Sequence, residues 1–157
     1  IDVKNGQRFK ESDTLSAGNS ITVFDTKWGK MGLCICYDFR FPELARLMVD
    51  LGAKIILVPA AFNMTTGPLH WELLFQSRAV DNQVFTIGTA PARNLNASYH
   101  SYGHSIIVSP WGKILNQADF EETALFTTIN LNEISLVREQ IPLLRHRRLD
   151  IYELTQK

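Results

Sequence analysis

The sequence predicts an α/β fold, and two patterns in its first half lead to this prediction. Residues 54–58 contain the unbroken apolar run Ile-Ile-Leu-Val, which is typical of a strand that is buried on both faces. Residues 31–36 form a second apolar run, and the segment between the two runs carries leucine and methionine at helical spacing. A strand, a helix and a second strand in this order form the repeating unit of α/β proteins.

Each element of the first half follows from local signals. Residues 21–24 alternate as a strand does, and residues 27–30 contain the glycine of a hairpin turn. Pro42 is well placed to begin a helix, because the first turn of a helix needs no N–H from it, and Gly52 ends that helix. We therefore expect a hairpin that leads into the strand–helix–strand unit.

The second half continues the alternation. We expect a helix over residues 70–83, strands over 84–89 and 105–108, a polar loop over 94–102, a hairpin turn at 111–113, a strand over 124–129, and a helix that starts near Asn130 and ends at Pro142. No stretch has the composition of a linker, so residues 1–157 are expected to form a single domain.

The composition excludes several classes of function. With 45% hydrophobic and 20% charged residues, the chain has the proportions of a globular protein. Sixteen Lys and Arg residues balance sixteen Asp and Glu residues, so no long-range field favours nucleic acid or an anionic membrane. No apolar run reaches the roughly 20 residues of a membrane span. We expect neither nucleic acid nor a membrane as a partner.

The two cysteines indicate a reducing compartment. Cys34 and Cys36 are separated by one residue, and a disulfide across that spacing would be badly strained. Two free thiols are typical of a cytoplasmic protein. The cysteines and histidines do not have the spacing of a zinc site, and no glycine-rich nucleotide motif occurs.

Cys36 is the first candidate for chemistry. It lies at the predicted end of a buried strand, before the turn into a helix, where a nucleophile is held rigidly. The backbone N–H of Tyr37 can face a developing oxyanion there, and a nearby helix N-terminus favours the reactive thiolate. The alternative is a small buried hydrophobic residue, which is the interpretation we favour for Cys34.

Polar residues that follow Cys36 have structural and functional interpretations. Asp38, Arg40 and Glu43 are expected to brace the turn rather than to touch a substrate. Residues 62–68 follow a buried strand, where open α/β sheets place a binding crevice, and a plain strand-to-helix connection fits them equally well.

Two histidines are also candidate partners of Cys36 in a Cys–His dyad. His70 or His104 could pair with Cys36, because such partners need only meet in space, and a structural or surface role is the other interpretation of each. Glu11, taken alone, looks like a solvated acidic residue of a loop.

Five stretches of the sequence resemble one enzyme superfamily. They are GLCICYDFRFPEL at residues 32–44, PAAFNMTTGPLHWE at 59–72, SRAVDNQ at 77–83, GHS at 103–105 and PWG at 110–112. Together they resemble the nitrilase superfamily of carbon–nitrogen hydrolases across essentially the whole chain. The second stretch is most similar to the omega-amidase branch of that superfamily.

The resemblance implies a fold and a site. The fold is an α-β-β-α four-layer sandwich of the nitrilase type, of which these residues would be the C-terminal portion. The nucleophile maps onto Cys36 and a supporting glutamate onto Glu11. The backbone N–H of Tyr37 would form part of the oxyanion hole, and the substrate pocket would be lined by Phe62, Asn63 and Thr66. No cofactor and no metal would be needed, and homo-oligomers are usual in the superfamily.

The implied activity is hydrolysis of the terminal amide of a dicarboxylic acid monoamide, such as α-ketoglutaramate or α-ketosuccinamate, through a thioester on Cys36. The catalytic lysine and the general-base glutamate of the superfamily precede the segment that matches Ile1, and neither motif occurs here. We therefore expect a domain whose N-terminal part is missing and which is inactive alone. Arg40 and Arg93 are both candidates for binding the far carboxylate of the substrate.

Two alternative functions stay open. One is an amidase that acts on deaminated glutathione or on another carbon–nitrogen substrate, because that branch has a similar loop at residues 62–68. The other is a truncated, non-catalytic module that binds a partner or a carboxylate ligand.

Overall fold

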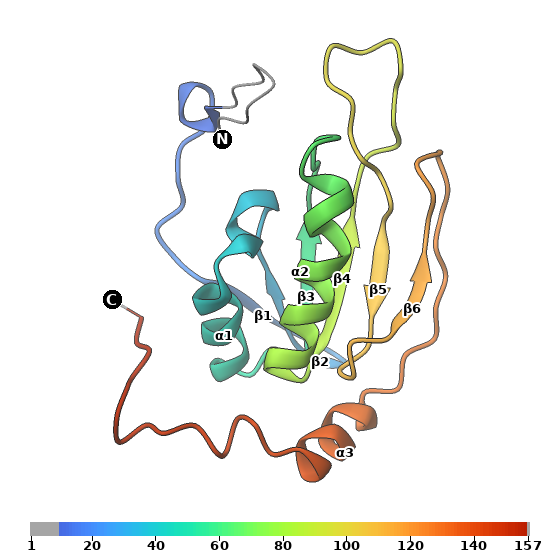
Figure 1. The fold of residues 1–157 in the computed structure, drawn as a ribbon. Coiled ribbons are helices and arrows are strands. Elements are labelled where there is room, and N and C mark those ends of the chain that lie inside the picture. Colours follow the sequence, from blue (N-terminus) through green and yellow to red (C-terminus); the bar gives the residue numbers. More distant parts are fainter. Residues whose placement is uncertain (1–9, 157) are drawn as a thin grey trace.

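The computed structural model describes residues 10–156 and contains a six-stranded sheet in the order β1-β2-β3-β4-β5-β6 (Figure 1). The strands are β1 (Thr22–Thr26), β2 (Gly29–Leu33), β3 (Ile55–Pro59), β4 (Phe85–Thr89), β5 (Ile106–Val108) and β6 (Ile114–Gln117). The three central strands, β2 to β4, are parallel, and β1, β5 and β6 join them in antiparallel pairs.

The helices are α1 (Pro42–Asp50), α2 (Gly67–Asn82) and α3 (Asn132–Gln140), with short 3₁₀ helices η1 (Glu11–Asp13) and η2 (Cys36–Arg40). Figure 1 shows α1 and α2 side by side across one face of the sheet. The predicted α/β class is confirmed, and residues 10–156 form one sheet with its helices rather than all four layers of the sandwich.

Two packed clusters follow from the alternation of side chains along the strands. Ile56 and Val58 of β3 point into the larger cluster beneath α1 and α2. Ile55, on the opposite face, packs with Phe85 of β4 and Ile134 of α3. The apolar run of β3 is therefore buried from both sides, as its sequence predicts.

The structure corrects the predicted elements in two places near the site. β2 ends at Leu33, because the Asp38 carboxylate accepts a hydrogen bond from the Ile35 N–H and turns the chain into η2. The helix expected to start at residue 70 begins at Gly67, since Pro68 is suited to the first turn.

The predicted strand over residues 124–129 is wrong. This segment belongs to no strand, and the strand that follows the hairpin turn at 111–113 is β6. The Asn116 side chain of β6 donates a hydrogen bond to the Phe126 carbonyl, in place of a backbone ladder. The Phe126 side chain is 85% exposed, so the segment lacks the burial that a hydrophobic strand needs.

The tail after α3 is fixed to α1 by one ion pair. The guanidinium of Arg147 makes two hydrogen bonds, 2.8 and 2.9 Å long, to the carboxylate of Asp50.

Among residues 10–156 we find no helix with the length and apolar character needed to cross a bilayer.

Candidate active site

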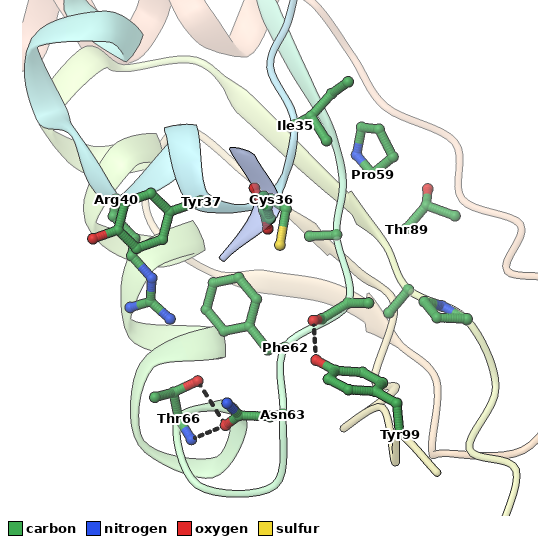
Figure 2. Close-up of a pocket in the computed structure, with 15 residues that line it drawn as sticks. Ile35, Cys36, Tyr37, Arg40, Pro59, Phe62, Asn63, Thr66, Thr89 and Tyr99 are labelled. Carbon is green, nitrogen blue, oxygen red and sulfur yellow. Dashed lines mark hydrogen bonds between the residues drawn. The ribbon is translucent and has the colours of Figure 1, made fainter. Parts of the chain in front are cut away.

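A cavity of about 620 Å³ lies at the carboxyl ends of the parallel strands β3 and β4, where α/β sheets place their ligands. It brings together the six residues that the resemblance implies for the site: Glu11, Cys36, Tyr37, Phe62, Asn63 and Thr66. Figure 2 shows the Cys36 sulfur pointing into this space. The rest of the lining is Ile35, Arg40, Pro59, Ala60, Ala61, Thr89, Ala90, Pro91 and Tyr99.

Cys36 is held in an unusual backbone conformation. Its φ of 49° lies in the left-handed region, which costs energy for a residue with a side chain. It opens η2 directly after the extended Ile35, and the Asp38 N–H bonded to the Ile35 carbonyl closes the turn at 3.1 Å. The sharp turn presents the thiol at the edge of the sheet, as expected of a nucleophile held on a strained turn.

The electrostatics of Cys36 combine opposing effects. Burial raises the pKa of the Cys36 thiol and is the largest effect. Hydrogen bonds from the backbone N–H groups of Ala61 and Tyr37 and the positive charge of Arg40 lower this pKa, whereas the negative charge of Glu11 raises it. The turn therefore favours the thiolate through the Tyr37 N–H, but burial outweighs the donors and the net shift of the pKa is upward.

Cys34 differs from Cys36 in burial and in its surroundings. It is 5% exposed within the core cluster, and burial raises the pKa of its thiol to about 12. Cys34 is thus a core residue, as the sequence predicts, and its thiol stays protonated.

Arg40 forms one wall of the cavity. Its guanidinium lies 4.4 Å from the centre of the Phe62 ring, and its Nη1 lies 3.0 Å from Nδ1 of His70. Burial lowers the pKa of Arg40, but a guanidinium keeps its charge in proteins. The Arg40 side chain lines the cavity, so it lies where it could meet a ligand as well as brace the turn.

The other arginine considered for a substrate carboxylate lies elsewhere. Arg93 donates hydrogen bonds to the carbonyls of Ser101 and Tyr102, at 3.0 and 2.8 Å, and stacks on Phe120. It is not among the residues that line the cavity. Of the two candidates, Arg40 alone lies where it could meet a ligand beside Cys36.

The loop after β3 shapes the floor of the cavity. The Phe62 ring packs edge-on against Trp71, with 5.1 Å between ring centres. The Asn63 carboxamide oxygen accepts hydrogen bonds from the Thr65 N–H and from both the N–H and the hydroxyl of Thr66, at 2.8 to 3.1 Å. Asn63 therefore stabilises the turn that leads into α2. This structural role differs from the direct contact with a ligand that the resemblance implies.

Neither candidate histidine lies beside Cys36. His70 is bonded to Arg40, and His104 stacks on Tyr102 with its Nδ1 2.7 Å from the Tyr102 carbonyl. Both are missing from the lining of the cavity, so a Cys–His dyad has no support in the described residues. The described chain also has no cluster of three His, Cys, Asp or Glu side chains that could hold a metal ion.

Tyr99 is one of the cavity residues that sequence reasoning missed. It comes from the polar loop before β5, and its hydroxyl donates a hydrogen bond to the Ala61 carbonyl (Figure 2). The available signal was a tyrosine in a polar loop that follows the carboxyl end of a parallel strand. That signal is weak, because many exposed loops carry a tyrosine.

Comparison with known proteins finds a matching family model and several relatives. A family model described as carbon–nitrogen hydrolase matches residues 1–139. An omega-amidase of Xenopus laevis, NIT2-A, is 52% identical over all 157 residues, which cover 57% of that protein. An omega-amidase of Saccharomyces cerevisiae, NIT3, is 51% identical over 97% of this chain and 52% of its own length. The chain spans about half the length of these curated relatives.

Solved structures agree with the sequence matches. The crystal structure of yeast Nit3, described as a member of branch 10 of the nitrilase superfamily, aligns with a TM-score of 0.84 and 52% identity. The alignment covers 88% of this chain and 51% of that one. The Caenorhabditis elegans NitFhit protein aligns with a TM-score of 0.90 and 37% identity over 98% of this chain and 38% of its own.

Proposed function

Because this chain belongs to the carbon–nitrogen hydrolase family, we propose that it supplies the nucleophile of an omega-amidase. The reaction is hydrolysis of the terminal amide of a dicarboxylic acid monoamide, such as α-ketoglutaramate or α-ketosuccinamate, to the acid and ammonia. The observation that carries the proposal is the strained Cys36, whose thiol opens into a cavity beside a carboxylate and a guanidinium. The names of relatives at about half identity support the choice of substrate class.

The proposed mechanism has two steps. A glutamate N-terminal to Ile1 takes the proton of the Cys36 thiol, and the thiolate attacks the amide carbonyl to give a tetrahedral oxyanion. The C–N bond then breaks, ammonia leaves with the proton returned by the glutamate, and a thioester remains. Water, deprotonated by the same glutamate, attacks the thioester, releases the acid and restores the thiol.

The oxyanion needs donors that are already in place. The backbone N–H of Tyr37 lowers the pKa of the Cys36 thiol, and we propose that it serves the adjacent carbonyl oxygen, beside the family's lysine. Donors of this kind contribute about 3–4 kcal/mol each to the transition state. Glu11, on η1 at the rim of the cavity, would orient that lysine.

We propose Arg40 as the group that binds the far carboxylate of the substrate. Among the residues that line the cavity, Glu11 and Arg40 are the ones with a charge, and Arg40 carries the positive one. Its stacking on Phe62 and its contact with His70 fix the guanidinium, so little conformational freedom is lost when an anion binds.

A chimera tests the proposed activity. The part of the Xenopus relative that this chain does not match is placed before Ile1, and ammonia release from α-ketoglutaramate is compared with that of the 157-residue chain. We expect turnover by the chimera and negligible turnover by the chain alone, because the lysine and the general base are supplied only in the chimera. A well-folded chimera that releases no ammonia would favour the non-catalytic module, and preference for deaminated glutathione would favour the neighbouring branch.

Replacing Arg40 by methionine in the chimera is expected to lower kcat/KM for α-ketoglutaramate by about 10- to 100-fold, because a charge-assisted hydrogen bond contributes roughly 1.5–3 kcal/mol. The loss should appear mainly in KM. Hydrolysis of butyramide, which lacks the carboxylate, serves as the reference and should change little. An equal loss on both amides would mean that Arg40 supports the site without reading the carboxylate.

We further propose a homo-oligomer in the cytoplasm. The exposed face of α2 carries Leu69, Leu73 and Val80, which are 70%, 60% and 41% exposed and lie along one side of the helix. Burial of this stripe against a second copy would remove it from water, and sedimentation velocity can test whether the chain forms such an oligomer.

Both cysteines of the chain are free thiols, which suits the reducing compartment that we propose.

A further inference from the structure

One loop brings a side chain to the nucleophile from outside the recognised motifs. Tyr99 lies in the loop between β4 and β5 and lines the cavity that holds Cys36. Its hydroxyl donates a hydrogen bond to the Ala61 carbonyl. Figure 2 shows the Tyr99 ring on the side of the cavity opposite Arg40, with Cys36 between them.

The base of this loop is firmly attached. Arg93 donates hydrogen bonds to the carbonyls of Ser101 and Tyr102, at 3.0 and 2.8 Å, and so closes the loop on itself. The Tyr102 N–H donates to the Phe62 carbonyl at 2.7 Å, and Asn63 pairs with Ser101 in an isolated bridge. The loop that carries Tyr99 is therefore held against the loop after β3.

Ala61 connects Tyr99 with the thiol. Its carbonyl accepts the hydrogen bond from Tyr99, and Ala61, Cys36 and Tyr99 line the same cavity. The Ala61 N–H lowers the pKa of the Cys36 thiol. The hydrogen bond from Tyr99 therefore restrains the backbone of the residue whose N–H acts on the thiol. Burial raises the pKa of the Tyr99 hydroxyl, as do the negative charge of Glu11 and that of Cys36 when it is a thiolate, so the hydroxyl keeps its proton and remains a donor.

We infer that Tyr99 is a positioning residue: its hydroxyl fixes Ala61 so that the Ala61 N–H stays directed at the Cys36 sulfur and stabilises the thiolate. The inference rests on the proposed role of Cys36 as the nucleophile. The loop that carries Tyr99 would then help to stabilise the Cys36 thiolate, in addition to covering the cavity.

The test measures the thiol itself and needs no turnover. The full 157-residue chain and its Tyr99→Phe variant are alkylated with iodoacetamide between pH 6 and 11, and modification of Cys36 is followed by peptide mass spectrometry, which separates it from Cys34. We expect Tyr99→Phe to move the midpoint of the pH profile upward and to slow alkylation at pH 8 about three- to tenfold, the effect of losing one hydrogen bond. Tyr152→Phe, which removes an exposed hydroxyl in the tail, is the matched control and should leave the profile unchanged.

Each other outcome counts against the inference. An unchanged midpoint with faster alkylation at high pH would mean that Tyr99 only restricts access to the cavity. An unchanged profile would mean that Ala61 keeps its orientation without the hydroxyl. A Cys36 that reacts in neither chain would overturn this inference together with the proposed nucleophile, whereas a reactive Cys36 that ignores Tyr99 would leave the proposed function intact.

Discussion

Replacing Cys36 by alanine is expected to lower amide hydrolysis by the chimera at least about 10³-fold, because loss of the nucleophile removes the covalent step itself. The remaining donors around the cavity can still bind the amide, so KM should change far less than kcat. The measurement is steady-state ammonia release from α-ketoglutaramate, with quenched-flow mass spectrometry to detect the acyl-enzyme. No species carrying the acyl mass should form in the variant.

Cys34→Ala is the control for this substitution. Cys34 lies two positions earlier in the sequence and is buried in the core, away from the cavity. The change removes a small core side chain and is expected to cost stability but to keep kcat within about threefold. Equal loss of activity in both variants would show that the chimera is sensitive to packing near β2 and would remove the case for Cys36 as the nucleophile.

Replacing Trp71 by alanine is expected to lower the free energy of unfolding by about 3–5 kcal/mol. The Trp71 ring is fully buried between Phe62 and Phe75, with ring centres 5.1 and 4.7 Å away. Its Nε1–H also donates a 2.6 Å hydrogen bond to the His104 carbonyl, which the variant leaves without this donor. Urea unfolding followed by circular dichroism measures the loss.

The matched control is Trp28→Ala at the tip of the β1–β2 hairpin. Trp28 is 61% exposed and contacts Lys27 through its ring, so its removal should change the free energy of unfolding by less than about 0.5 kcal/mol. If Trp71→Ala cost no more than Trp28→Ala, the packing between the floor of the cavity and α2 would not be a main source of stability.

The fold could be predicted where a single local signal decides the structure. The apolar run of residues 54–58 predicts β3, and the structure has that strand. Pro42 and Gly52 predict the start and the end of α1, and the structure has both residues at those ends. The sequence predicts a strand over residues 124–129, but a strand also needs a partner. The described chain offers the Phe126 carbonyl only the side chain of Asn116.

The site was predicted less evenly. The motif around Cys36 named the residues that meet in the cavity, because one short turn and one short loop carry most of them. The ionisation of the thiol could not be predicted, since it depends on how deeply the sulfur is buried. Tyr99 could not be predicted either, because it reaches Ala61 across 38 positions of sequence through loop packing alone.

The order of strands in the sheet matches the order of synthesis. Each strand of the described sheet pairs with the strand made just before it, from β1 to β6. Such short-range pairing favours fast folding, because little chain entropy is lost before each contact forms. A chain leaving the ribosome can therefore extend the sheet strand by strand, and the turn that holds Cys36 would be in place before the loop with Tyr99 emerges.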